Sequence, residues 1–309
     1  MIKSSTMRIS VKGKPVEVPC LLIEGRTIIV RGRILRIAGV FDDFLDSRDI
    51  DDPEPIIRAL KENRESDIFN FLGSFSVAVG EKERPAWQTC YQIEYDHLAA
   101  IRVVSFERWW THDIKKQARR KVKKAKEKNV TVCQVPLDDQ LLKGIVRIFN
   151  EMPVRQERPF WHYGKGFRQV KEEISTYADR SIFLGAYCRD ELIGFAKLIN
   201  CGDFGRANQL ISMVKHRDKP VTNALIAELV RTCESKSIPY LVYGAWFEGS
   251  LGHFKKNNGF KKVAIPRYYN ALTFKGRVAL RLGIHKGVRE FLPDPIRKNL
   301  RSIRRVWYR

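Results

Sequence analysis

Phe254-Lys255-Lys256-Asn257-Asn258-Gly259-Phe260 ends a short helix that the sequence predicts over residues 250–258. Gly259 suits the left-handed backbone conformation that commonly follows a helix, because glycine has no Cβ to clash there. The aromatic Phe260 directly behind it can then fold back onto a core. A strand is predicted over residues 240–246, so this stretch closes a β–α unit.

A second informative stretch, Leu192-Ile193-Gly194-Phe195-Ala196, lies in a predicted strand hairpin whose turn is Arg189-Asp190-Glu191. Between the two stretches a helix is expected with one apolar side, formed by Leu225, Ile226, Leu229 and Val230. Working outward, we expect strands at 130–135, 182–188, 192–200, 207–214, 240–246, 263–265 and 267–274, and helices at 138–152, 167–177, 221–235 and 250–258.

The N-terminal region predicts a smaller α+β domain. Asp51-Asp52-Pro53 suits the start of a helix that runs to Lys61. Strands are expected at 8–11, 16–23, 27–30, 34–38, 68–72, 76–79 and 87–93, and a long helix at 106–129 with the apolar stripe Ala118, Val122 and Ala125. The expected parts are an N-terminal α+β domain (1–105), a basic linking helix (106–129), the main domain (130–274) and a basic amphipathic tail (275–309).

The net charge of +22 in 309 residues is concentrated in two segments. Residues 115–128 hold nine lysines and arginines against one glutamate, and residues 275–309 hold eleven against Glu290 and Asp294. Such segments attract nucleic-acid phosphates or an anionic membrane surface, and the alternative is a solvated face that keeps the protein in solution. The tail interleaves apolar and basic residues up to Trp307-Tyr308, which suits either a membrane-surface segment or an RNA-binding arm.

The six cysteines are scattered, without a C-x-x-C pair or a histidine at metal-ligand spacing. We therefore expect reduced thiols and no metal site. The first thirty residues show no secretory signal and no 18 apolar residues run together, so we expect a cytoplasmic protein. The basic segments leave open a peripheral attachment to the inner face of the membrane.

The order of elements over residues 130–274 resembles that of the GNAT superfamily of acyltransferases. Leu192–Ala196 is similar to the third strand of that fold, and Phe254–Phe260 is similar to the end of its last helix. The basic helix followed by Asn129-Val130-Thr131-Val132 resembles the segment that leads into the second module of Fem-type aminoacyltransferases. The resemblance implies an α/β (α+β) fold, a GNAT-like mixed twisted sheet flanked by helices. The region before it would be a smaller α+β domain or a degenerate first copy.

The acyl donor is left open by the resemblance. GNAT enzymes hold the coenzyme A pyrophosphate on a glycine-rich turn at a helix amino terminus, where free N–H groups favour phosphate. The matching residues 216–224 contain no glycine, and Pro220 lacks an N–H. Fem-type proteins take the acyl group from aminoacyl-tRNA instead, so the donor is acyl-CoA or aminoacyl-tRNA. The resemblance places the donor site at Met213, Val214, Lys215, Arg217, Lys219, Asn223 and Ala224.

A polar and aromatic cluster at residues 151–165 falls where GNAT-like enzymes shape the acceptor pocket. Arginines there can grip a carboxylate or phosphate, and the aromatic rings can stack on a sugar or base. We expect acceptor contacts from Glu151, Arg155, Arg158, Trp161, Tyr163, Lys165 and Tyr268. His162 and Glu248 are candidate bases, and the resemblance suggests Tyr269 as the acid for the leaving group. For the loop, the alternative is a surface segment anchored by its aromatics.

The sequence thus favours an N-acyltransferase whose acceptor is a small or lipid-linked amine, in a cell-envelope or polysaccharide precursor. Two alternatives stay open: a nucleic-acid-binding protein on a GNAT-like body without catalysis, and a membrane-peripheral scaffold. Expected partners are the amine acceptor, tRNA and an anionic membrane surface, and the oligomeric state is left open. Fold alone does not fix function, so this hypothesis rests partly on analogy.

Overall fold

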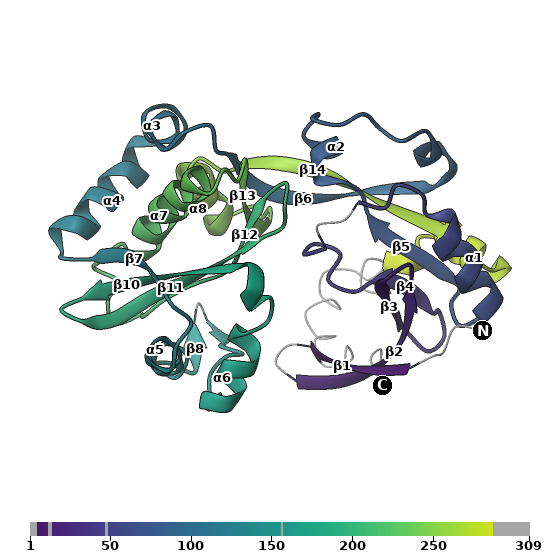
Figure 1. Ribbon diagram of the computed structural model, residues 1–309, viewed down its shortest axis with the longest axis horizontal. Helices are drawn as coiled ribbons and strands as arrows, with labels where there is room; N and C mark the ends of the chain where they lie inside the picture. The colour runs from purple at the N-terminus through teal and green to yellow at the C-terminus, as the bar shows by residue number, and fades with distance from the viewer. Residues whose placement is uncertain (1–4, 12–13, 47–48, 156, 287–309) are drawn as a thin grey trace. The chain divides into compact units, whose positions relative to one another are not determined.

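The computed structural model describes residues 5–11, 14–46, 49–155 and 157–286, which form two compact units (Figure 1). One unit contains the described residues up to Asp96 and those from Ile265 onward, and the other is His97–Ala264. Strands β6 (Gln92–Arg102) and β14 (Lys261–Ala271) contribute residues to both units. The second unit is continuous in sequence, whereas the first unit includes the part of β14 that follows it, from Ile265 onward.

The second unit is a mixed sheet with helices on both faces. The strand order is β6-β13-β12-β11-β10-β7. Its own strands are β7 (Thr131–Val135), β10 (Ser181–Cys188), β11 (Glu191–Asn200), β12 (Gly205–Ser212) and β13 (Tyr240–Ala245). Its helices are α3 (Phe106–Arg108), the π-helical turn η2 (Trp109–Asp113), α4 (Lys116–Glu127), α5 (Asp139–Phe149), α6 (Phe167–Ile174), the 3-10 turn η3 (Ala178–Arg180), α7 (Val221–Ser235) and α8 (Ser250–Asn257). A two-stranded ribbon, β8 (Val154–Arg155) with β9 (Arg158–Pro159), lies in the loop after α5.

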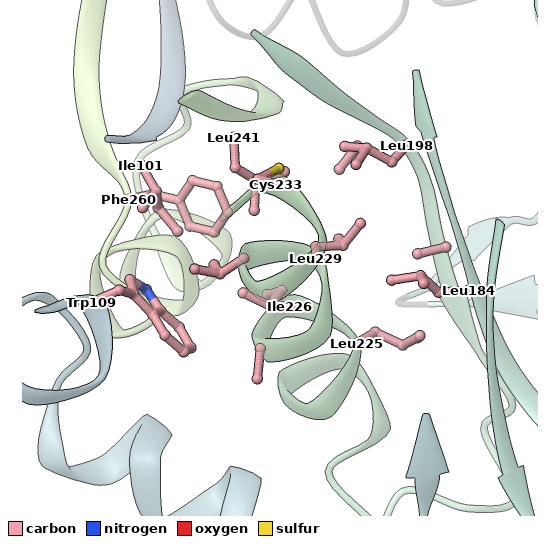
Figure 2. Close-up of a cluster of buried hydrophobic side chains, with 14 of the residues drawn as sticks. Ile101, Trp109, Leu184, Leu198, Leu225, Ile226, Leu229, Cys233, Leu241 and Phe260 are labelled. Carbon is pink, nitrogen blue, oxygen red and sulfur yellow. The ribbon is translucent and has the colours of Figure 1, made fainter. Parts of the chain in front are cut away.

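Side chains that alternate along the strands build two cores, one on each face of this sheet. Leu225, Ile226 and Leu229 of α7 pack with Leu184 and Leu198 on the first face (Figure 2). Helices α5 and α6 cover the second face, where Phe149 and Ile174 pack with Phe183 and Phe195. This period of two is what a sheet buried on both faces requires.

Two local features predicted from the sequence are confirmed. Gly259 has a φ of 88° behind α8, and Phe260 is buried in the core of α7. At Gly194, an added Cβ would lie 2.7 Å from Cγ1 of Val221, so the glycine lets β11 approach the start of α7 closely. The sequence motif therefore places the amino end of α7 against the middle of the sheet.

The first unit has, among its described residues, a shorter version of this order of elements, without helices between its first two strands. Its strands are β1 (Ser5–Val11), β2 (Lys14–Ile23), β3 (Arg26–Arg31), β4 (Ile37–Val40) and β5 (Ile68–Leu72), and the sheet order is β1-β2-β3-β4-β5-β14. The helices are α1 (Glu54–Asn63), α2 (Phe75–Ala78) and α9 (Phe274–Arg281), with 3-10 turns η1 (Ala86–Cys90) and η4 (Ile284–Lys286). Strands β4 and β5 are parallel and flank α1 in sequence, as β12 and β13 flank α7. The first region is thus a second, smaller version of the same fold.

Several predicted elements differ from the structure. Residues 76–79 were expected as a strand, but residues 76–78 belong to α2 and Val79 follows its end; at the start of this helix Val77 N–H donates to Ser74 Oγ. The expected helix 106–129 is interrupted after η2, where Ile114 is extended and buried. The strands expected at 263–265 and 267–274 correspond to the single strand β14, which ends at Ala271, so that Phe274 belongs to the next helix instead.

Helix α4 packs within the second unit, through Ala118 and Ala125 against the core that contains α7. The boundaries between the two units lie at Asp96/His97 and Ala264/Ile265. The predicted ranges were 1–105, 106–129, 130–274 and 275–309. Those ranges stay a prediction about modules. Of the predicted tail, residues 287–309 lie outside the described part of the chain.

Candidate active site at the diverging strands

The parallel strands β12 and β13 separate towards their carboxyl ends. They pair only through Gly205↔Leu241 and Arg206↔Val242, within a part of the chain that is described throughout. Beyond these pairs, β12 stays paired with β11 and β13 with β6. The pairing of β13 with β6 shifts register between Val242 and Ala245, where Gly244 has a positive φ of 56°. Helix α7 begins beyond the carboxyl end of β12. In open α/β sheets this is where ligands bind, outside the carboxyl ends of strands that part.

The turn between β12 and α7 satisfies most of its own N–H groups. Arg217 N–H donates to Val214 O over 3.1 Å, Lys219 N–H to His216 O over 2.9 Å, and Val221 N–H to Lys219 O over 2.7 Å. In the first turn of α7, Asn223 and Ala224 donate to Pro220 O. An anion would therefore meet few free donors from these residues, unlike at an ordinary helix amino terminus.

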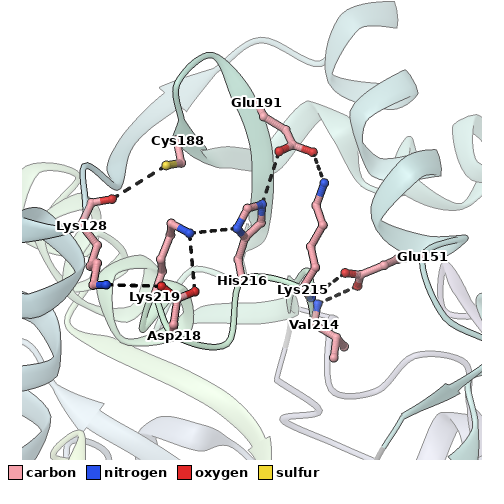
Figure 3. A network of polar contacts seen from close by, with 9 residues as sticks. All are labelled: Lys128, Glu151, Cys188, Glu191, Val214, Lys215, His216, Asp218 and Lys219. Atoms are coloured by element: carbon pink, nitrogen blue, oxygen red, sulfur yellow. Dashed lines mark hydrogen bonds and ion pairs between the residues drawn. The ribbon is translucent and has the colours of Figure 1, made fainter.

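A carboxylate from the protein itself binds the start of this turn. Glu151 Oε2 accepts from Val214 N–H over 2.6 Å, and Glu151 Oε1 accepts from Lys215 N–H over 2.7 Å (Figure 3). Arg155 lies 3.3 Å from Glu151 and also donates to Ser212 O and Ile148 O. Both side chains are mostly buried, with 12% and 15% exposed. Glu151 and Arg155 were expected to bind an acceptor, and here they connect α5 and β12 to the turn.

Charged side chains continue the network along the turn. Lys215 Nζ lies 2.6 Å from Glu191, and His216 lies 3.3 Å from the same carboxylate. Lys219 contacts His216 and Asp218, and Lys128 at the end of α4 lies 3.5 Å from Asp218 (Figure 3). The turn is therefore connected both to the β10–β11 hairpin and to the basic helix.

The remaining residues expected at the donor site lie inside the unit. Met213 is buried and its N–H donates to Ile193 O over 2.8 Å. Asn223 is buried and donates to Asn258 Oδ1 over 2.9 Å, so its amide joins α7 to α8. Ala224 packs against the core of α7.

The loop between α5 and α6 separates into a buried and an exposed part. His162 is 3% exposed, stacks on Trp161 and Phe149, and lies 3.3 Å from Glu173. Burial lowers the pKa of His162, and Glu173 opposes this effect. Lys165 pairs with Glu173 over 2.5 Å. Trp161, Tyr163 and Arg158 are exposed on the same loop, and their contact with an acceptor stays a prediction.

The other predicted residues lie on either side of the division between the units. Glu248 belongs to the second unit, is exposed and accepts from Trp246 Nε1 over 3.2 Å. Tyr268 and Tyr269 belong to the first unit. Tyr269 contacts His285 edge to face, whereas Tyr268 is fully buried among aromatics, with no hydrogen-bond partner found for its hydroxyl within the described chain. Burial raises the pKa of each tyrosine to about 12.

Lys255 is the residue at the diverging strands that the sequence reasoning missed. It lies on α8, is 1% exposed, and donates to Tyr243 O and Ala245 O, each over 2.6 Å. These carbonyls belong to the end of β13 that leaves β12, so the ammonium group satisfies backbone acceptors there. A signal was present, since Lys255 is part of the Phe254–Phe260 stretch, but a lysine in a helix is ordinarily taken as exposed.

A second lysine, Lys197 on β11, is also fully buried. Its Nζ donates to Ile174 O over 2.8 Å and also to Thr176 O. Burial lowers the pKa of Lys197 and that of Lys255 to about 8, because the charged form loses its hydration.

We predict that Lys197 and Lys255 titrate near pH 8 in the folded protein, below the usual lysine pKa of about 10.4. The measurement is the ¹³Cε chemical shift of labelled lysines against pH. Lys255→Met and Lys197→Met should each remove one of the two early titrations, and Lys256→Met, a change of the exposed neighbour, should remove neither. Titration of Lys255 above pH 10 would contradict the buried position.

The described residues contain no helix long and apolar enough to cross a membrane. Within the same residues, no group of three or more histidine, cysteine, aspartate or glutamate side chains is arranged to hold a metal ion.

No protein-family model matches the sequence, and no curated protein matches it. Solved structures do match the fold. FemX superposes with a TM-score of 0.57 at 8% identity, covering 86% of this chain and 88% of FemX. The C-terminal domain of an Agrobacterium fabrum protein assigned as a lysylphosphatidylglycerol synthetase gives 0.56 at 11% identity, covering 85% and 86%. L-PGS from Bacillus licheniformis gives 0.53 at 13% identity, covering 86% and 88%.

These likenesses establish the fold. The chain has a mixed, GNAT-like α/β fold, and the resemblance to Fem-type proteins is confirmed at the level of the fold. The identities of 8 to 13% leave activity, donor and acceptor to be argued from this chain's own residues.

Proposed function

We propose that this protein transfers an aminoacyl group from aminoacyl-tRNA to an amino group of a small or lipid-linked cell-envelope or polysaccharide precursor. The observation that carries the proposal is the separation of β12 and β13 beside the amino end of α7. A donor and an acceptor can meet at such a position without crossing a hydrogen-bonded sheet. FemX and L-PGS, which share the fold, support acyl transfer as the class of reaction.

The β12–α7 turn favours a donor other than acyl-CoA. Most of its N–H groups donate to Val214 O, His216 O, Lys219 O or Pro220 O, and those of Val214 and Lys215 donate to Glu151. A pyrophosphate would have to break these hydrogen bonds and displace a carboxylate of its own charge. Each buried polar group left without a partner costs about 1–3 kcal/mol, so the exchange is unfavourable.

The basic helix α4 supports an RNA donor. Its apolar side chains Ala118 and Ala125 are buried, whereas the lysines and arginines at positions 115, 116, 120, 121, 123, 124, 126 and 128 are exposed. No apolar ridge is exposed on this helix to enter a bilayer, and the charge suits a phosphate backbone. Lys115 N–H donates to Asn257 O at the end of α8, and Lys128 contacts Asp218 of the turn. The helix therefore connects the two segments that border the diverging strands.

Lys255 gives the site a buried positive charge. Two of its three N–H groups bind the carbonyls of Tyr243 and Ala245, which leaves one N–H and the charge near the end of β13. A tetrahedral intermediate of acyl transfer carries an oxyanion, and a fixed donor in a water-poor setting stabilises it strongly. Phe247, which is half exposed, lies 5.3 Å from Nζ and covers it, so Lys255 needs a shift of that ring to meet substrate directly.

The proposed reaction is the aminolysis of an ester. The acceptor nitrogen attacks the ester carbonyl of the aminoacyl-tRNA, a C–N bond forms, and the C–O bond to the terminal ribose breaks. The ribose oxygen leaves with a proton and the attacking nitrogen loses one to a base. We propose the exposed Glu248 as that base. The assignment of Tyr269 as the acid stays a prediction from the resemblance. We assign His162 a positioning part beneath the loop that carries Trp161 and Tyr163, because it is buried.

The proposal is tested with bulk tRNA charged with ¹⁴C-labelled amino acids and an extract of envelope precursors and lipids. The protein should move label from tRNA into the precursor or lipid fraction faster than spontaneous ester hydrolysis does. Acetyl-CoA labelled in its acetyl group, offered in the same extract, should give no transfer. Transfer from acetyl-CoA and none from tRNA would overturn the choice of donor, and transfer from neither would overturn the enzymatic proposal.

We further predict that α4 supplies phosphate contacts. Changing Arg120, Lys123 and Lys124 to glutamine should weaken binding of bulk uncharged tRNA about ten- to a hundredfold at 0.1 M salt. The slope of log Kd against log salt should fall by about two to three, because each lost phosphate contact removes about one unit.

The matched control for α4 changes three exposed cations of the first unit, Arg33, Arg58 and Lys61, to glutamine. It removes the same charge from another surface and should leave the slope nearly unchanged. Equal loss in both triple variants would show that net charge alone binds tRNA, and would contradict a dedicated role for α4.

A further inference from the structure

Helix α9 and the turn after it expose a row of large apolar side chains. Phe274 is 73% exposed, Val278 40%, Leu282 57% and Ile284 37%. Phe274, Val278 and Leu282 are spaced four apart, so they lie along one side of the helix and its cap. Scattered exposed apolar residues are ordinary, but an aligned row on one helix marks an interaction surface.

The opposite side of α9 is fixed to the first unit. Ala279 and Leu280 are buried with Leu35 and Ile68. An added Cβ at Gly276 would lie 2.0 Å from Asp67 O, so the helix backbone rests directly on that residue. Thr273 caps the helix by accepting from Gly276 N–H, and its hydroxyl donates to Asp67. The exposed row is thus held outward on a well-anchored helix.

The charge around this row is positive. Residues 274–286 contain no aspartate or glutamate. Arg277 and Arg281 are exposed on the helix beside the apolar row, whereas Lys275 pairs with Asp67 and Lys286 with Glu94. The sequence then continues with seven further lysines and arginines up to Arg309.

From this combination we propose that the exposed face of α9, formed by Phe274, Val278, Leu282 and Ile284 with Arg277 and Arg281, docks on an anionic membrane surface. Large apolar side chains enter the boundary between headgroups and acyl chains, and arginines beside them meet anionic headgroups. A nucleic acid would use the arginines and leave the aligned apolar row in water, so a membrane fits the surface better. The proposal does not depend on the transferase activity.

The test is binding of the full chain to vesicles. Wild-type protein should float with vesicles of phosphatidylcholine containing one quarter phosphatidylglycerol and bind pure phosphatidylcholine vesicles weakly. The double variant Phe274→Gln/Leu282→Gln should bind the anionic vesicles at least about tenfold more weakly, because it removes the two most exposed side chains of the row. Arg277→Gln/Arg281→Gln should weaken binding to anionic vesicles about tenfold or more, and binding to neutral ones little.

The matched control is Leu22→Gln/Ile34→Gln, which removes apolar side chains that are 67% and 84% exposed elsewhere in the first unit. It should bind vesicles as the wild type does. All variants change exposed positions, and unchanged circular dichroism and thermal midpoint will show that they fold.

Three outcomes would overturn the proposal. If wild-type protein does not bind anionic vesicles, another occupant covers the face, such as residues 287–309 of the chain itself. If the Phe274/Leu282 variant binds vesicles undiminished, other basic residues hold the membrane. If that variant loses bulk tRNA binding and keeps vesicle binding, the face belongs to an RNA-binding arm.

Discussion

Replacing Lys255 by methionine should lower the rate of aminoacyl transfer by at least about a hundredfold. The change keeps the length and apolar stem of the side chain but removes the charge and the donors to Tyr243 O and Ala245 O. Loss of one fixed donor to an oxyanion costs enzymes about 10²–10³ in turnover, and here the end of β13 also loses its support. The effect should fall on kcat more than on KM for the charged tRNA, because the tRNA backbone is bound elsewhere.

The same residue predicts a pH dependence. The folded-state pKa of Lys255 is about 8, below the usual value, because burial disfavours the ammonium form. Charged Lys255 is therefore present below pH 8 and is lost as the pH rises through 8. If the charge supports transfer, the rate should fall with a midpoint near pH 8 in the wild type, and the residual rate of the methionine variant should lack this fall.

Lys256→Met is the control for this prediction. Lys256 is the next residue on α8 and is exposed, so its replacement should change kcat by less than about threefold. If the Lys255 variant, shown to be folded by its thermal midpoint, transfers as fast as the wild type, the proposed electrostatic part of Lys255 is wrong.

Replacing Glu151 by alanine should lower the free energy of unfolding of the second unit by about 3 kcal/mol. The change removes the acceptor for the N–H groups of Val214 and Lys215, and leaves Arg155 buried without its carboxylate. Breaking a buried ion pair on one side costs far more than removing an exposed pair. Urea denaturation followed by tryptophan fluorescence measures the difference.

Two further variants make the Glu151 prediction specific. Glu172→Ala removes a carboxylate that is 66% exposed and pairs with Arg168 on the surface, and should cost less than about 1 kcal/mol. Adding Arg155→Met to Glu151→Ala should recover part of the loss, because no unpaired charge then remains buried. A loss below 1 kcal/mol in Glu151→Ala would show that the turn does not depend on this carboxylate.

The helices and the hairpin of the second unit could be predicted from the sequence because the signals for them are local. The apolar side of residues 221–235 predicts α7 with its observed bounds, and Asp138, a residue type that favours the N-cap, accepts from Leu141 N–H at the start of α5. The β10–β11 hairpin follows from Arg189 and Asp190, which both take positive φ values. Period, cap and turn chemistry each act within a few residues, and so they can be recognised without knowing the fold.

What the sequence could not show depends on distant neighbours. The burial of Lys255 follows from the position of two carbonyls of β13, and that of His162 from the aromatics Phe149 and Trp161 around it. The break before α4 arises because Trp109 is buried and donates to Asn258 O, 149 residues away. No local pattern encodes these partners.

The pairing of β14 with β5 also determines when the first sheet can be completed during synthesis. The neighbour that completes the first sheet, at residues 265–271, is translated almost two hundred residues after β5. Until it emerges from the ribosome, the edge of β5 stays unpaired and open to association with other chains. The first unit therefore cannot reach its final form before residues 265–271 have been made, and a chaperone that covers the open edge of β5 would protect it until then.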